Sequence, residues 1–122
     1  MNIELSTIVI DCANPAGLGR FWCAATGYVT LHEDDEPLDP DDTWVKIGPK
    51  DGGTAMAFQR VPEPKTVKNR VHVDFLTDDE EAEAARLEGL GARRLWVSEN
   101  PDDIFIVLGD PEGNEFCLVR RA

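Results

Sequence analysis

Residues 70–97, RVHVDFLTDDEEAEAARLEGLGARRLWV, contain a strand pattern, a helix pattern and a second strand pattern in direct succession. In RVHVDFL, apolar residues alternate with His72 and Asp74, so one face packs while the other presents an imidazole and a carboxylate. The helical segment that follows ends at a glycine, and Thr77 and Glu80 have capping-box spacing ahead of it. The stretch RRLWV then returns to the composition of a strand.

Two more strands are expected towards the end of the chain. They are DIFIVLG (103–109) and NEFCLVRR (114–121), and the turn DPEG joins them. The second half of the chain therefore has the order strand, helix and three strands.

The first half repeats this order. STIVIDC (6–12) predicts a strand, and the helix after it has Asn14 as N-cap, Pro15 at its first position and Gly27 at its end. YVTLH, TWVKIG and TAMAFQRV are the three strands that follow.

The two halves can be laid on each other as an internal repeat. One offset places Thr7 on His72, and another places Gly48 on Gly109. The repeat predicts an α+β fold of two βαβββ modules about a pseudo-twofold axis. The single expected domain has three parts: module one at about residues 1–61, a proline-containing linker at about 62–69 and module two at about 70–122.

Size and charge limit the classes of function. The 122 residues suffice for one domain, and 24 acidic against 12 basic residues give a net charge of −12. Such a charge argues against nucleic acid, and no apolar run is long enough for a membrane span. MNIELSTIVID has no basic region before its apolar stretch, so we expect a cytoplasmic protein. The acidic stretch 32–42 is expected to be a solvated loop.

Three stretches together resemble the vicinal oxygen chelate superfamily, and within it the small glyoxalase-like proteins of the glyoxalase, bleomycin resistance and dioxygenase type. They are DCANPAGLGRFWCAATGY (11–28), KTVKNRVHVDF (65–75) and DPEGNEFCLV (110–119). The resemblance covers nearly the whole chain. It implies curved half-barrel sheets that form a cup around a ligand, and a homodimer. The superfamily contains isomerases, lyases, dioxygenases, resistance enzymes and non-catalytic drug binders, so fold alone does not select a function.

The resemblance also implies four positions at which metal-dependent members hold an ion. Here they are Thr7, Met56, His72 and Cys117. A hydroxyl and a thioether are poor ligands for Zn²⁺ or Fe²⁺, so only the imidazole and the thiol are suitable. Two donors are too few, and we therefore expect no tight metal site and no cofactor. A bound divalent metal would need His72 together with Cys117, Gln59 or Glu115.

His72 and Asp74 have two interpretations. In one they are acid–base or hydrogen-bonding groups of the ligand site, because imidazole titrates near neutral pH. In the other they hydrogen-bond to the adjoining KTVKN segment. The expected ligand-binding residues are Thr7, Trp44, Met56, Phe58, His72 and Cys117.

Several of the remaining candidates have a structural alternative. Trp44 is either an aromatic wall of the site or core, and Trp96 is core or cover for an edge strand. Leu18, Phe21 and Trp22 are expected to pack as core. The three thiols, Cys12, Cys23 and Cys117, are expected to be reduced and buried, although Cys117 beside His72 would be a nucleophile.

The resulting hypothesis is a protein that binds a small organic molecule in a metal-free, partly apolar cup. If it is an enzyme, a lyase or isomerase with His72 as base is expected. The alternatives are a metal-dependent enzyme of glyoxalase or dioxygenase type, and a non-catalytic binder of a cationic drug. The metal-dependent alternative requires three donors around His72.

Overall fold

The computed structural model describes residues 2–32 and 37–122 and shows an α+β fold. The chain divides into two compact units, of which the first ends at Pro64 and the second begins at Lys65. This boundary lies within the stretch expected to be a linker. Part of the expected acidic loop, residues 33–36, lies outside the described residues.

The first unit has the order strand, helix and three strands. Its elements are β1 (Thr7–Cys12), α1 (Pro15–Thr26), β2 (Val29–Thr30), β3 (Trp44–Gly48) and β4 (Ala55–Arg60). The sheet order is β1-β4-β3-β2, with β1 parallel to β4 and the other pairs antiparallel.

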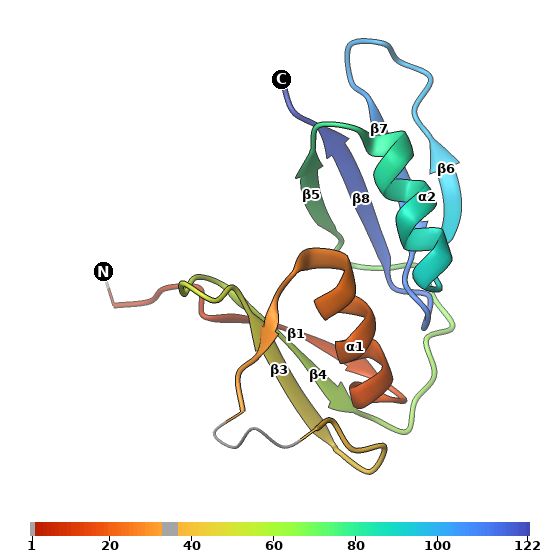
Figure 1. The fold of residues 1–122 in the computed structure, drawn as a ribbon. Coiled ribbons are helices and arrows are strands. Elements are labelled where there is room, and N and C mark those ends of the chain that lie inside the picture. The colour runs from red at the N-terminus through yellow and green to blue at the C-terminus, as the bar shows by residue number, and fades with distance from the viewer. Residues whose placement is uncertain (1, 33–36) are drawn as a thin grey trace. The chain divides into compact units, whose positions relative to one another are not determined.

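The second unit repeats this arrangement element by element. Its elements are β5 (Val73–Thr77), α2 (Glu80–Leu90), β6 (Arg93–Val97), β7 (Phe105–Gly109) and β8 (Glu115–Arg120). The sheet order β5-β8-β7-β6 matches that of the first unit, and again only the first and last strands pair in parallel. The predicted α+β class and the two βαβββ modules are thus confirmed (Figure 1).

Both helices begin and end as their sequences dictate. The side chain of Asn14 accepts a hydrogen bond from the Gly17 N–H, and Gly27 ends α1 in the left-handed region with φ 79°. The capping box predicted at Thr77 and Glu80 is wrong, because Thr77 is the last residue of β5. The N-cap of α2 is Asp79, whose side chain accepts from Ala82 N–H.

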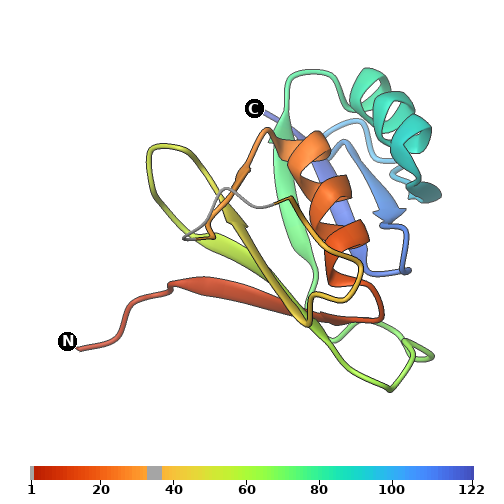
Figure 2. The same ribbon diagram turned by 60° about the horizontal axis from the view of Figure 1, so that its bottom comes forward.

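Helix α1 covers one face of the first sheet (Figures 1 and 2). Leu18, Phe21 and Trp22 of this helix are buried, as expected. A Cβ at Gly19 would lie 2.8 Å from Val45 Cγ1, so Val45 points towards α1. The register partner of Val45 is Phe58, which therefore lies on the same side.

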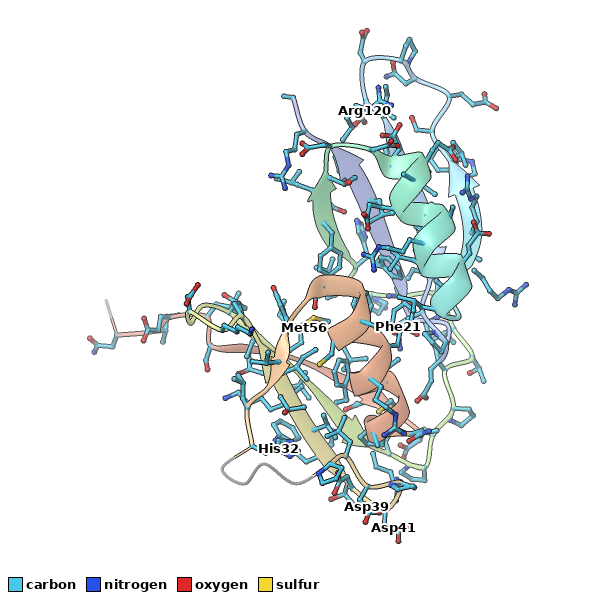
Figure 3. The ribbon with its side chains drawn as sticks, in the orientation of Figure 1. Phe21, His32, Asp39, Asp41, Met56 and Arg120 are labelled. Carbon is cyan, nitrogen blue, oxygen red and sulfur yellow. The ribbon has the colours of Figure 1, made fainter. Side chains whose placement is uncertain are left out.

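Helix α2 covers one face of the second sheet (Figure 1). The apolar residues buried in this unit are Ala84, Leu87, Ala92, Ile106, Leu108, Phe116, Cys117 and Leu118. At the start of the helix, Arg120 Nε donates to Glu80 Oε2 over 2.9 Å, and the Glu80 side chain is only 4% exposed. Figure 3 shows Arg120 at this end of the sheet.

The two modules differ by one residue in an equivalent turn. Residues 49–54 connect β3 to β4, whereas residues 110–114 connect β7 to β8. The longer turn has two consecutive glycines with positive φ, Gly52 at 87° and Gly53 at 129°, and the shorter turn has only Gly113 at 86°. The additional residue changes which side chains of β4 correspond to those of β8.

Within the described ranges, neither helix has the length and apolar character needed to cross a membrane.

Candidate functional site

The second sheet has one face packed by α2 and an opposite face that carries the candidate site. Arg94 and Arg120 mark the α2 side, because they pair with Glu81 and Glu80 of that helix. Strand alternation then places Cys117 on the opposite face. We call this opposite face the donor face. It consists of Asp74, Leu76, Arg93, Trp96, Phe105, Val107, Gly109, Glu115, Cys117 and Val119.

Three potential ligand groups meet on the donor face. His72 lies directly before β5, Asp74 lies within β5, and Cys117 is the register partner of Asp74 on β8. One donor atom of each residue lies within 4.8 Å of the other two, and His72 Nε2 is 3.5 Å from Asp74 Oδ1. The imidazole and the carboxylate are 57% and 58% exposed, whereas Cys117 is buried. We call these three residues the donor cluster.

The thiol of the donor cluster is held in its protonated form. Burial is the largest cause that raises the pKa of Cys117 to about 11, followed by the charge of Asp74 and a hydrogen bond to it. The charge of Glu115 raises this pKa further, and Lys68 lowers it. A thiol with this pKa is not an activated nucleophile at neutral pH. The buried-thiol interpretation therefore describes Cys117 better than the nucleophile interpretation.

The segment before β5 fixes the position of the donor cluster. Lys68 Nζ lies 2.6 Å from Glu115 Oε2, so the nearest additional carboxylate already has a cationic partner. Asn69 Nδ2 donates to the carbonyls of Val71 and Glu115 over 3.0 and 3.3 Å. These two bonds join the chain next to His72 to the start of β8. One sequence-based alternative had His72 and Asp74 hydrogen-bonded to the KTVKN segment. Among the described residues, Lys68 and Asn69 of that segment instead bond to Glu115, and His72 lies next to Asp74.

The donor face changes from polar to aromatic across the sheet. Asp74, Cys117, Val107 and Trp96 are successive register partners on β5, β8, β7 and β6. A register shift between Arg94 and Trp96 brings the indole onto this face. Trp96 is 55% exposed, and its ring centroid lies 5.3 Å from that of Phe105. The expectation that Trp96 is core is thus wrong, and its edge-strand position is as expected.

The first unit places its predicted site residues on two different faces. Thr7, Trp44 and Gln59 lie on the face opposite α1. Each is next in its strand to a residue of the α1 side or an odd number of positions away from one, and successive strand residues point to opposite faces. Trp44 is 44% exposed, so the core alternative for this residue is wrong. The face opposite α1 thus presents an indole and an amide side by side.

Met56 and Phe58 lie on the face covered by α1. Their register partners are Ile47 and Val45, and all four residues are buried. Figure 3 shows Met56 beside α1. The additional turn residue shifts β4 by one position relative to β8. As a result, Val9 pairs with Ala57 in the way that Asp74 pairs with Cys117. Ala57, and not Met56, is therefore the counterpart of Cys117, and the implied four-residue metal set does not fit the structure.

Sequence reasoning did not include Asp74 among the residues that a bound metal would need. The carboxylate comes close to the thiol because the parallel register with β8 brings Cys117 opposite it. Cys23, expected to be buried, is partly exposed, and burial raises its pKa.

The two four-stranded βαβββ modules are consistent with the fold of the vicinal oxygen chelate superfamily. A model of the glyoxalase-like domain family matches residues 7–119, and the chain belongs to this family. A comparison with curated protein sequences gave no match.

Solved structures with the same fold include proteins of several kinds. A glyoxalase/bleomycin resistance protein/dioxygenase family enzyme from Burkholderia phytofirmans PsJN has 18% identity and a TM-score of 0.75, over 97% of this chain and 98% of that one. The fosfomycin resistance protein FosX from Mesorhizobium loti has 15% identity and a TM-score of 0.73, over 100% and 95%. TnmS3, an antibiotic-binding protein from Streptomyces sp. CB03234, has 19% identity and a TM-score of 0.69, over 100% and 99%. At these identities the likeness shows the fold alone.

Proposed function

We propose that the protein binds a small organic molecule on the donor face of the second module, with His72 as the acid–base group. The observation that supports this most directly is the row from Asp74 to Trp96. It places a carboxylate and an exposed indole at opposite ends of one four-strand row. Apolar walls with a few convergent polar groups are typical of small-molecule sites. The ligand would have a flat apolar body and a polar end.

The proposed acid–base role depends on the His72–Asp74 pair. A neutral imidazole can accept a proton from a bound molecule, and the neighbouring carboxylate stabilises the imidazolium that forms. The separation of 3.5 Å between Nε2 and Oδ1 is close enough for this electrostatic support. Proton abstraction of this kind belongs to a lyase or isomerase. The expected homodimer and cytoplasmic location remain predictions.

A second candidate is a non-catalytic binder of a cationic compound. The exposed carboxylate of Asp74 lies on the donor face, and the chain has a net charge of −12. Resistance and antibiotic-binding proteins among the similar folds support this candidate. Electrostatic capture would weaken with added salt, whereas binding to the aromatic end would not.

The test is an NMR screen of the metal-free protein in EDTA, with size-matched aromatic amines, neutral aromatics and aromatic carboxylates. We expect shift changes confined to residues 72–76, 93–97 and 105–119. Trp96→Ala should abolish them, whereas Trp44→Ala, which removes an exposed indole of the other module, should leave them unchanged. Shifts that depend on Trp44 instead would overturn the proposed location. Binding by amines alone, lost in high salt, would favour the second candidate.

A further inference from the structure

Arg93 is a cation of the donor face that the fold does not use. It begins β6 on that face, whereas its neighbour Arg94 lies on the α2 side and pairs with Glu81 and Glu88 over 2.8 and 3.1 Å. Arg93 is exposed, and within residues 2–32 and 37–122 its side chain forms no ion pair or hydrogen bond. A guanidinium has five N–H donors in a planar fork, which matches the geometry of a carboxylate.

Arg93 lies in the same row of the donor face as His72. The register pairs Arg93 with Gly109, and Gly109 with Glu115. The register between β5 and β8, continued one position before Val73, places His72 beside Glu115. The two ends of the row are three strand spacings apart, which is about 14 Å between Cα atoms. A molecule with one or two aromatic rings can therefore extend from the guanidinium to the imidazole.

The middle of this row is open because Gly109 has no side chain. A Cβ at Gly109 would have its nearest neighbour, Leu95 Cδ1, at 3.6 Å, and the φ of this residue is not positive. Neither crowding nor backbone strain therefore requires glycine here. The corresponding Gly48 of the first module differs, since a Cβ there would lie 2.8 Å from Leu31 Cδ1. A strand glycine without a structural requirement is typical of a place where a ligand approaches the backbone.

The local charges favour an anion at the Arg93 end of the row. Lys68 Nζ lies 2.6 Å from Glu115 Oε2, so the carboxylate in the middle of the row is neutralised. Asp74 is on β5, at the opposite edge of the sheet. The net charge of −12 is spread over the whole chain, and salt screens exposed charges beyond about 8 Å. The free guanidinium therefore dominates the field at its own end of the row.

The equivalent position of the first module has no cation. Val29 pairs with Gly48 in the way that Arg93 pairs with Gly109. An isopropyl group offers no hydrogen-bond donor to an anion. The guanidinium is thus a feature of the second module, on the face that carries the proposed ligand site.

We propose that Arg93 binds the carboxylate of an aromatic acid, whose ring lies over Gly109 beside Trp96 and whose far end reaches His72. The inference rests on the proposed function and names the class of its ligand. Two parallel hydrogen bonds between the guanidinium and the carboxylate would orient the molecule along the row.

The test compares naphthylacetate with its neutral isostere naphthylacetamide and with naphthylethylamine, by NMR titration of the protein in EDTA. Wild type should bind the acid about three- to tenfold more tightly than the amide, as expected for a solvated guanidinium–carboxylate pair. Arg93→Gln should reduce the affinity for the acid to that for the amide and leave the amide unchanged. Arg86→Gln removes the same charge from α2, on the other side of the sheet, and should retain the preference.

A charge reversal gives a second measurement at the same position. Arg93→Glu should bind naphthylethylamine more tightly than the acid. The inference would be rejected if wild type bound the acid no more tightly than the amide or the amine, or if the preference survived in Arg93→Gln. Shifts that depend on Trp96 without any preference for the acid would leave the proposed function intact while rejecting the role of Arg93. Shifts that depend on Trp44, or no binding of any of the three compounds, would reject both.

Discussion

Asp74 and Cys117 face each other across the parallel pair β5 and β8, and the carboxylate helps to keep the thiol protonated. An apolar residue in place of Asp74 would leave burial and the charge of Glu115 to raise the pKa of the thiol. The pairing therefore sets the reactivity of the cysteine as well as the geometry of the donor cluster.

The first prediction concerns this reactivity in EDTA. With a pKa of about 11, Cys117 should be alkylated by iodoacetamide slowly at pH 8, and the rate should rise by about tenfold per pH unit up to pH 10. Asp74→Asn removes a negative charge and should lower the pKa of the thiol, which increases the rate at pH 8. Site-resolved mass spectrometry separates Cys117 from the other two cysteines. A wild-type rate that levels off near pH 8.5 would contradict the prediction.

The second prediction concerns the Glu80–Arg120 pair at the start of α2. Hydrogen bonding to Arg120 is the largest cause that lowers the pKa of Glu80. The pair should therefore stabilise the fold above the unfolded-state pKa of about 4.3 and lose this effect as the pH falls through the lower folded-state value. Glu80→Gln should reduce the free energy of unfolding at pH 7 by about 1–2 kcal/mol, with allowance for the partly exposed arginine.

Urea unfolding at several pH values measures this effect. Glu83→Gln is the matched control in the same helix, because the Glu83–Arg86 pair is exposed and should contribute less than about 0.5 kcal/mol. The difference between wild type and Glu80→Gln should shrink below about pH 4. An equal loss in both variants at pH 7 would show that the Glu80–Arg120 pair contributes no more than an exposed pair.

The third prediction uses two glycines at the end of α2. Gly89 lies within the helix with open space around its Cβ position, so Gly89→Ala should stabilise the fold by about 0.5–1 kcal/mol. Gly91 has φ 118°, so Gly91→Ala should destabilise it by about 1 kcal/mol or more. Both values follow from urea unfolding curves. If both substitutions changed the free energy of unfolding in the same direction, α2 would not end between these two glycines.

The fourth prediction concerns Asn69 as a positioning residue. Its side-chain amide spans two backbone carbonyls, and its Oδ1 is buried without a hydrogen-bond partner among the described residues. Asn69→Ala should increase amide hydrogen exchange in residues 70–75, because the start of β5 loses its connection to β8. Exchange in α2 should be unchanged. Unaltered exchange at residues 70–75 would mean that β5 holds His72 in place without this side chain.

The sequence was sufficient to predict the repeat because each element carries local signals. Asn14 and Gly27 fix the ends of α1 by side-chain capping and positive φ, which are properties of single residues. The alignment of β8 with β4 was less secure, because it rested on matching two turns of unequal length. Because of the additional residue in residues 49–54, Met56 lies on the α1 side of β4. The sequence of β4 is apolar on both faces and therefore does not reveal which residues face the helix.

The donor cluster was predicted only in part for a related reason. His72 and Cys117 could be chosen by residue type, whereas the contribution of Asp74 required the cross-strand register. Trp96 reaches the donor face through an irregularity between β6 and β7, which the alternation of RRLWV does not reveal. Local patterns thus identify the elements, and pairing between distant segments decides which side chains meet.

The matching registers of the two modules also make this chain a template for protein design. Thr7, Val9 and Ala57 stand on the same backbone framework that carries the donor cluster in the other half. Thr7→His, Val9→Asp and Ala57→Cys would copy the cluster into the first module without any change of loop or strand. A single polypeptide would then carry the donor cluster twice, once in its own second module and once engineered into the first, and the two copies could be compared directly.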